Sequence, residues 1–90
     1  MSFTDKNVLV TGGTRGIGRS IVESFASKGA NVAFTYRSSS DEANALVAEL
    51  EERGVKARAI QADAADFGAA EAAVGGIISE WGSIDVVVNN

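Results

Sequence analysis

Hydrophobic and polar residues alternate along this chain with a period that switches repeatedly between that of a strand and that of a helix. Short apolar runs predict strands over residues 7–11, 31–36, 56–61 and 84–88. Between them, apolar residues spaced three and four apart predict helices over residues 16–28, from the serines at 38–40 to Gly54, and from Asp66 to Gly82. Strands alternating with helices through short connections are typical of an α/β fold with a parallel sheet.

Each predicted helix has an apolar stripe and a glycine at its end. Glycines at 29, 54 and 82 are typical helix C-terminal residues. The third helix also contains Gly75-Gly76, and each glycine costs a helix about 1 kcal/mol relative to alanine. This pair is either a tolerated weakness on a surface or a site of close packing against a neighbour. The stripes are Ile17, Ile21 and Phe25, then Ala43, Leu46, Val47 and Leu50, then Ala70, Val74, Ile77 and Trp81.

A glycine-rich turn over residues 11–18 joins the first strand to the first helix. Gly12 allows a sharp exit from the strand, Gly16 allows a pyrophosphate to approach the backbone, and Gly18 allows the helix to pack closely. A tight turn alone would also use glycines, but strand, spacing and helix agree on a phosphate-binding turn at a helix N-terminus. The candidate phosphate contacts are Gly12, Thr14, Gly16, Ile17 and Gly18.

The end of the second strand bears on which nucleotide fits. NAD sites usually carry an acid there, which binds the ribose 2′-hydroxyl. Here the chain reads Tyr36-Arg37-Ser38, with no acid before Asp41, and the glycine turn nearby contains Arg15. Two guanidinium groups and a serine hydroxyl suit a 2′-phosphate, which favours NADP(H) over NAD(H). The alternative is that both arginines are ordinary solvated surface cations.

Polar residues also follow the third and fourth strands, where ligands bind in open α/β sheets. We expect the Asp63 carboxylate to accept the adenine amino group, with the Ala64 backbone alongside. Asp66 is more typical of a helix cap. Asn89 and Asn90 are predicted to bond backbone groups or the nicotinamide-side ribose, or else to fray as terminal residues.

Composition narrows the function classes. The chain has 90 residues, which predicts a single domain over 1–90, and 46% of them are hydrophobic, which argues against a disordered tail. It contains no cysteine or histidine, so disulfides, thiolate metal sites and imidazole catalysis are excluded, and we expect no metal. The net charge of −4 argues against a nucleic-acid partner. The lack of a long apolar run argues against a membrane partner, and we expect a cytoplasmic protein.

Together, three segments resemble the short-chain dehydrogenase/reductase family in its NADP(H)-using form. They are the Thr-Gly-x-x-x-Gly-x-Gly turn at 11–18, Ala62-Asp63, and the run at 85–90. The resemblance implies half of a doubly wound Rossmann fold, with a four-stranded parallel sheet in the order 3-2-1-4. It also implies NADPH-dependent carbonyl reduction, with an acyl-carrier thioester as substrate, in a full-length protein.

The resemblance also implies that catalysis needs residues absent from this chain. The family's catalytic serine, tyrosine and lysine lie beyond the asparagine segment. The single tyrosine here, Tyr36, is followed four positions later by Ser40 rather than by lysine. We therefore predict no catalytic residue and no turnover by the chain alone.

Two other functions remain as alternatives. The strand over 84–88 would be an apolar sheet edge, and such edges pair with other chains, so we expect a homodimer formed through this strand. The chain would then be a non-catalytic, self-associating half-Rossmann module. An S-adenosylmethionine site also uses a glycine-rich turn, but it generally needs an acid after the second strand, where Arg37 stands.

Overall fold

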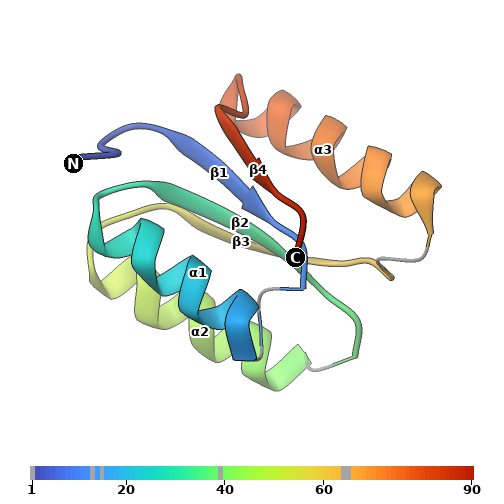
Figure 1. Cartoon of the computed structure of the whole chain (residues 1–90), viewed down its shortest axis with the longest axis horizontal. Coiled ribbons are helices and arrows are strands. Elements are labelled where there is room, and N and C mark those ends of the chain that lie inside the picture. Colours follow the sequence, from blue (N-terminus) through green and yellow to red (C-terminus); the bar gives the residue numbers. More distant parts are fainter. Residues whose placement is uncertain (1, 13, 15, 39, 64–65) are drawn as a thin grey trace.

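Four parallel strands form one sheet in the order β3-β2-β1-β4, which confirms the predicted order (Figure 1). The computed structural model describes residues 2–12, 14, 16–38, 40–63 and 66–90. In the central pairing, Val8 lies opposite Val32 on β2 and Val86 on β4. The strands are β1 (Asn7–Val10), β2 (Asn31–Tyr36), β3 (Ala57–Gln61) and β4 (Val86–Val88). They match the predicted strands except for one or two residues at some ends.

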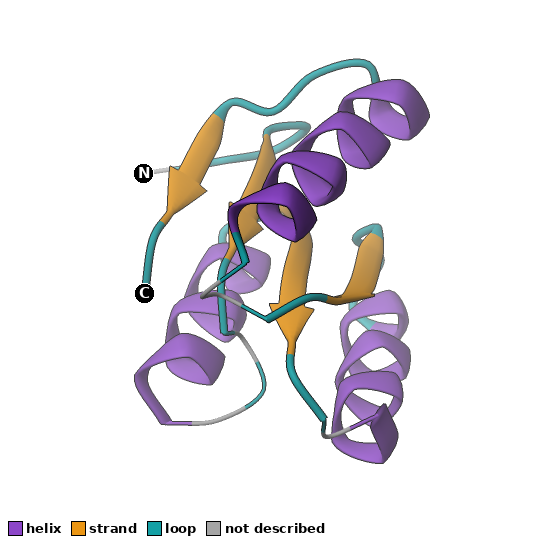
Figure 2. Ribbon diagram, turned by 90° about the vertical axis from the view of Figure 1, so that its right-hand side faces the viewer, coloured by secondary structure: helices purple, strands orange, loops and turns teal. Residues whose placement is uncertain are grey.

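Three helices cover the two faces of the sheet. Helices α1 (Gly16–Ser27) and α2 (Ser40–Glu52) lie on one face, and α3 (Phe67–Trp81) lies on the other (Figures 1 and 2). Right-handed crossovers explain this division, because the chain steps outward from β1 to β3 and then returns across the sheet to β4. The reversal lies between β1 and β4, and ligands bind at the carboxyl ends of strands beside such a reversal.

Local signals in the sequence set the helix ends. Gly29, Gly54 and Gly82 all have a φ near +90° (90°, 88° and 89°), the left-handed conformation that ends a helix. Asp66 caps α3, since its carboxylate accepts the Ala69 N–H at 3.2 Å. The predicted cap and the predicted helix-ending glycines are therefore confirmed.

The two faces of the sheet bury very different amounts of apolar side chain. The face under α1 and α2 holds a large continuous cluster that includes Phe34, while the cluster under α3 contains, among the residues described, the buried side chains of Leu9, Ala33 and Ile77. The predicted stripe of α2 packs into the larger cluster, and that of α3 packs into the smaller one, except for Ala70. The larger cluster contains Val8, Val10, Val22, Ala26, Ala30, Val32, Phe34, Ala43, Leu46 and Leu50.

The predicted stripe of α1 is only partly buried: Ile21 and Phe25 are half-buried against the larger cluster, but they are not the most buried residues of the helix. The residues that α1 buries are Gly18, Val22 and Ala26, one position further along the chain than predicted. Ile17 is 74% exposed. The reason is that α1 meets the sheet along the line of Gly18, Val22 and Ala26, so the predicted stripe lies beside this contact, where Ile21 and Phe25 still pack against the core.

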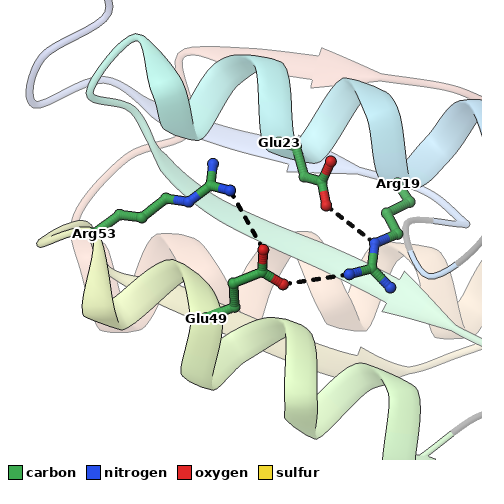
Figure 3. Close-up of polar contacts among 4 residues, drawn as sticks. All are labelled: Arg19, Glu23, Glu49 and Arg53. Atoms are coloured by element: carbon green, nitrogen blue, oxygen red, sulfur yellow. Dashed lines mark hydrogen bonds and ion pairs between the residues drawn. The ribbon is translucent and has the colours of Figure 1, made fainter.

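Ion pairs join α1 to α2 along their exposed sides (Figure 3). The Arg19 guanidinium bonds Glu23 on its own helix at 3.0 Å and Glu49 on α2 at 3.2 Å, and Arg53 bonds the other oxygen of Glu49 at 3.3 Å. The hydrogen bond to Glu23 is the main cause that raises the pKa of Arg19; desolvation opposes it, and attraction to Glu23, Glu49 and Glu42 adds to it.

Side-chain amides hold the strands in register at the amino end of the sheet. Asn31 on β2 donates to the Asn7 side chain on β1 at 3.0 Å and accepts the Lys56 N–H, beside β3, at 3.0 Å. The Asn7 amide donates in turn to the Ser83 carbonyl at 3.1 Å. Asp85, just before β4, accepts the Asn7 N–H at 2.8 Å. These bonds link all four strands at the edge opposite the predicted site.

The glycine pair in α3 is not a site of close packing within the described part of the chain. A Cβ added at Gly75 or Gly76 would meet no described atom within 4 Å. Gly76 instead lines a groove of about 390 Å³ between α3 and β3. No helix in the described ranges is both long and apolar enough to cross a membrane.

Candidate functional site

The turn between β1 and α1 needs glycine at three positions, each for a distinct reason. Gly12 and Gly16 have φ values of +67° and +54°, which other residues rarely adopt. Gly18 is required by space, because a Cβ there would overlap the carbonyl oxygen of Gly12. Above Gly16, by contrast, the described residues place no atom within 4 Å of an added Cβ. The turn is therefore closed on the α1 side and open above Gly16, where a phosphate could approach.

Hydrogen bonds tie this turn to the end of β4. The Asn90 N–H donates to the Thr11 hydroxyl oxygen at 2.9 Å, and its side-chain amide donates to the Gly12 carbonyl at 3.2 Å. The Thr11 hydroxyl is also 3.3 Å from the Asn89 side-chain oxygen. Figure 1 shows the C-terminus beside the carboxyl end of β1. The expectation that the asparagines bond backbone groups is thus confirmed for Asn90, while the nicotinamide-ribose role stays a prediction.

A second side chain fixes the turn from the other neighbouring strand. The Thr35 hydroxyl, on β2, accepts the Gly12 N–H at 3.0 Å. Thr35 is 3% exposed, and sequence reasoning did not identify it as a site residue. The sequence feature that could have identified Thr35 is its hydroxyl, which stands among the apolar residues of β2 one position before Tyr36.

The start of α1 fits a pyrophosphate. Its free N–H groups and positive dipole end lie directly after the turn, and its first turn contains no acidic residue. Thr14 is buried, while Gly16 and Ile17 are exposed and so open to a ligand. Arg15, the predicted partner of the 2′-phosphate in this turn, lies outside the described residues.

At the end of β2, Arg37 and Ser38 are exposed, as a 2′-phosphate contact requires. The backbone there is anchored, since the Gln61 amide donates to the Arg37 carbonyl at 3.2 Å and the Ala62 N–H donates to the Tyr36 carbonyl at 2.9 Å. The structure thus holds Arg37 at the predicted edge of the sheet, although its convergence with Arg15 is outside what the structure describes.

Beyond β3, Asp63 is exposed at the same edge, as predicted for an adenine contact. Its carbonyl accepts the Asp66 N–H at 2.9 Å, which leads the chain into α3. Ala64 lies outside the described residues. Seen from the carboxyl ends of the strands in Figure 2, the site therefore runs across β4, β1, β2 and β3 in one row.

This arrangement supplies binding groups: a helix N-terminus, a guanidinium, hydroxyls and amides. Within the described ranges, no three acidic side chains lie close enough together to hold a metal ion. The chemistry that these residues fit is recognition of an elongated, anionic nucleotide across the carboxyl edge of the sheet.

Comparison with known proteins agrees with this geometry. A family model described as short chain dehydrogenase matches residues 6–90. The 3-oxoacyl-[acyl-carrier-protein] reductase FabG of Staphylococcus aureus is 47% identical over 85 residues, which is 94% of this chain and 35% of the relative. The chain thus spans about a third of the length of that relative.

Two solved structures share the fold over the whole chain. A short chain dehydrogenase of Burkholderia cenocepacia, in complex with NADP, has a TM-score of 0.96 and 46% identity, covering 100% of this chain and 37% of its own. A blue fluorescent protein from a metagenomic library, in complex with NADPH, has a TM-score of 0.95 and 50% identity, with the same coverage. The protein therefore belongs to the short-chain dehydrogenase family.

Proposed function

We propose that this chain is the NADP(H)-binding portion of a short-chain reductase. The observation that carries the proposal is the turn between Gly12 and Gly18, which is closed against β4 and β2 and opens at the start of α1. The pyrophosphate would lie on the N–H groups of α1, and the residues that would hold it are Gly16, Ile17 and Gly18. Thr14 would add its hydroxyl.

The preference for NADP(H) over NAD(H) is part of this proposal. This preference is supported by the exposed Arg37 and Ser38 at the end of β2. In an NAD site, this position usually carries an acid that binds the ribose 2′-hydroxyl. The Burkholderia structure is a complex with NADP, and that of the metagenomic protein is a complex with NADPH. Asp63 would contact the adenine and Asn89 or Asn90 the nicotinamide-side ribose. Arg15 and Ala64 remain predicted contacts.

In a protein of the relatives' length, we propose that the bound cofactor would supply a hydride for reduction of a carbonyl group. The similarity to FabG favours an acyl-carrier thioester as the substrate and a cytoplasmic location. This chain spans 35% of that relative, and we expect no turnover from the 90 residues alone.

Calorimetric titration of the 90-residue chain with NADP⁺, NAD⁺ and S-adenosylmethionine tests the proposal. We expect NADP⁺ to bind most tightly and S-adenosylmethionine not to bind. Arg37→Asp should abolish the preference, lowering NADP⁺ affinity about tenfold or more, because a charged hydrogen bond to the 2′-phosphate is replaced by repulsion.

Lys56→Asp is the matched control for Arg37→Asp. It makes the same change of charge at an exposed residue before β3, at the opposite edge of the sheet. If both variants lower NADP⁺ affinity equally, the effect is one of overall charge and Arg37 does not recognise the 2′-phosphate. NADPH oxidation by the pure chain with a ketoacyl substrate would contradict the expected lack of turnover.

Self-association through β4 is a second candidate function, and the distribution of exposed apolar side chains favours it. The large hydrophobic side chains that are exposed in the described part of the chain are Ile17, Ile78 and Val87. Arg19 faces α2, so Ile17, two residues earlier on the helix, lies on the opposite flank of α1. Val87 is on the edge strand β4. Ile78 lies on the flank of α3 opposite Gly76 and Glu80, which line the groove toward β3. Ile17 and Ile78 thus lie on helix flanks turned away from α2 and from β3, and Val87 lies on the free edge of the sheet itself.

Light scattering over a range of concentrations tests this second proposal. We expect a dimer that Val87→Lys weakens, because a charge on the β4 edge opposes pairing. Ala72→Lys is the control, since it adds the same charge at an exposed position on the β3 side of α3. A wild-type chain that stays monomeric at the highest concentration would exclude the module.

A further inference from the structure

Both backbone polar groups of Gly12 are occupied by side chains from the strands on either side of β1. Its N–H donates to the Thr35 hydroxyl on β2 at 3.0 Å, and its carbonyl accepts from the Asn90 amide after β4 at 3.2 Å. Gly12 therefore has no N–H to offer a phosphate. Its two hydrogen bonds instead anchor the start of the turn to the strands on either side.

The Thr35 bond links two parts of the proposed site that are distant in sequence. Gly12 begins the phosphate-binding turn, and Thr35 stands two residues before Arg37, the proposed 2′-phosphate contact. Thr35 is 3% exposed, so its hydroxyl is held in a packed strand rather than in a mobile loop. Behind it, Gln61 anchors the Arg37 carbonyl at 3.2 Å. Beyond the last pair of the β1–β2 ladder, Val10 and Phe34, one buried side chain thus ties the turn to the end of β2.

We infer that Thr35 is a positioning residue for the dinucleotide, holding the glycine turn at the spacing that a bound pyrophosphate requires. The inference rests on the proposed NADP(H) binding. Thr35 touches neither the phosphates nor the ribose; it acts through Gly12. Its loss should therefore weaken every ligand that uses the turn, without changing the choice between NADP⁺ and NAD⁺, which is assigned to Arg37.

The test compares Thr35→Val, which keeps the shape and removes the hydroxyl, with Thr35→Ser, which keeps the hydroxyl. Affinities for NADP⁺ and NAD⁺ are measured on the 90-residue chain and corrected for the folded fraction. Removing one hydrogen bond should weaken both cofactors about fivefold in Thr35→Val, with their ratio unchanged. Thr35→Ser should bind like the wild type. A purely structural role would lower the midpoint of urea unfolding but leave the corrected affinities unchanged.

A measurement on the wild type covers the case in which Thr35→Val does not fold. In NMR titration with NADP⁺, the Gly12 amide resonance should move little, because the Gly12 N–H stays hydrogen-bonded to the Thr35 hydroxyl. The amide resonances of Ile17 and Gly18 should move strongly. A large Gly12 shift would overturn the inference, as would unchanged affinity in Thr35→Val or a loss in Thr35→Ser equal to that in Thr35→Val. A wild type that binds neither cofactor would instead overturn the proposed function, and this inference with it.

Discussion

The two faces of the same sheet are packed in different ways. Under α1 and α2, the described residues include a cluster of ten buried side chains, whereas the cluster under α3 has three. The first face is covered by two helices that are themselves joined by ion pairs, and the second by one helix with an open groove beside it. The comparison shows that buried apolar side chains, and with them the hydrophobic stabilisation expected from burial, are concentrated on the α1 and α2 face.

The largest expected effect comes from truncating a core side chain on each face. Leu46 on α2 and Ile77 on α3 are both 1% exposed. Leu46→Ala should lower the free energy of unfolding by about 3 kcal/mol, and Ile77→Ala by about 2 kcal/mol. The reason is that the cavity left by Leu46 is enclosed by the larger cluster, while Ile77 already borders the groove and its surroundings can relax. Urea denaturation measures both, and equal losses would contradict the contrast between the faces.

Glycine replacements should give opposite signs on the two faces. Gly18→Ala on α1 should destabilise the protein by about 1–3 kcal/mol, because its Cβ would overlap the Gly12 carbonyl. Gly76→Ala on α3 should stabilise it by about 0.5–1 kcal/mol, since the site is open and alanine favours the helix. Thermal unfolding of both variants checks the signs. A destabilised Gly76→Ala would show that the groove requires a glycine.

The smallest expected effect concerns one ion pair on each face of the sheet. A double-mutant cycle with Arg19→Met and Glu49→Gln should give a coupling of about 0.2–1 kcal/mol, since the side chains are 41% exposed and solvent screens them. The pair Arg58 and Glu80, between β3 and α3, is more exposed, at 55% and 44%, and should couple less. Urea unfolding at low and high salt checks both. A guanidinium is protonated through neutral and mildly alkaline pH, and the raised pKa of Arg19 moves its titration further from this range, so salt should reduce its coupling there and a rise in pH should not.

The sequence predicted the elements well because local signals mark their limits. Glycines that adopt a positive φ end the helices, and Asp66 caps α3. The stripe of α1 was the exception. Apolar spacing identified Ile17 as part of the apolar face, but Ile17 is exposed, and the fully buried residues of α1 are Gly18, Val22 and Ala26.

For the candidate site, sequence reasoning found the residues that would meet a ligand and missed those that hold them. The glycine motif, Arg37 and Asp63 are identified by their positions after strands. Thr35 was missed because nothing in a single strand shows that its hydroxyl meets the backbone of a residue 23 positions earlier. Long-range bonds of this kind appear only when the strands are paired.

The sequence by itself determined the order of strands and helices, the parallel sheet and the glycine turn, because period, caps and glycines act over a few residues. Only the tertiary structure decided which side chains of α1 are buried and how Thr35 and Asn90 fix Gly12 from both sides. These features depend on how closely packed elements approach one another, and that distance is set by the whole sheet rather than by any one segment.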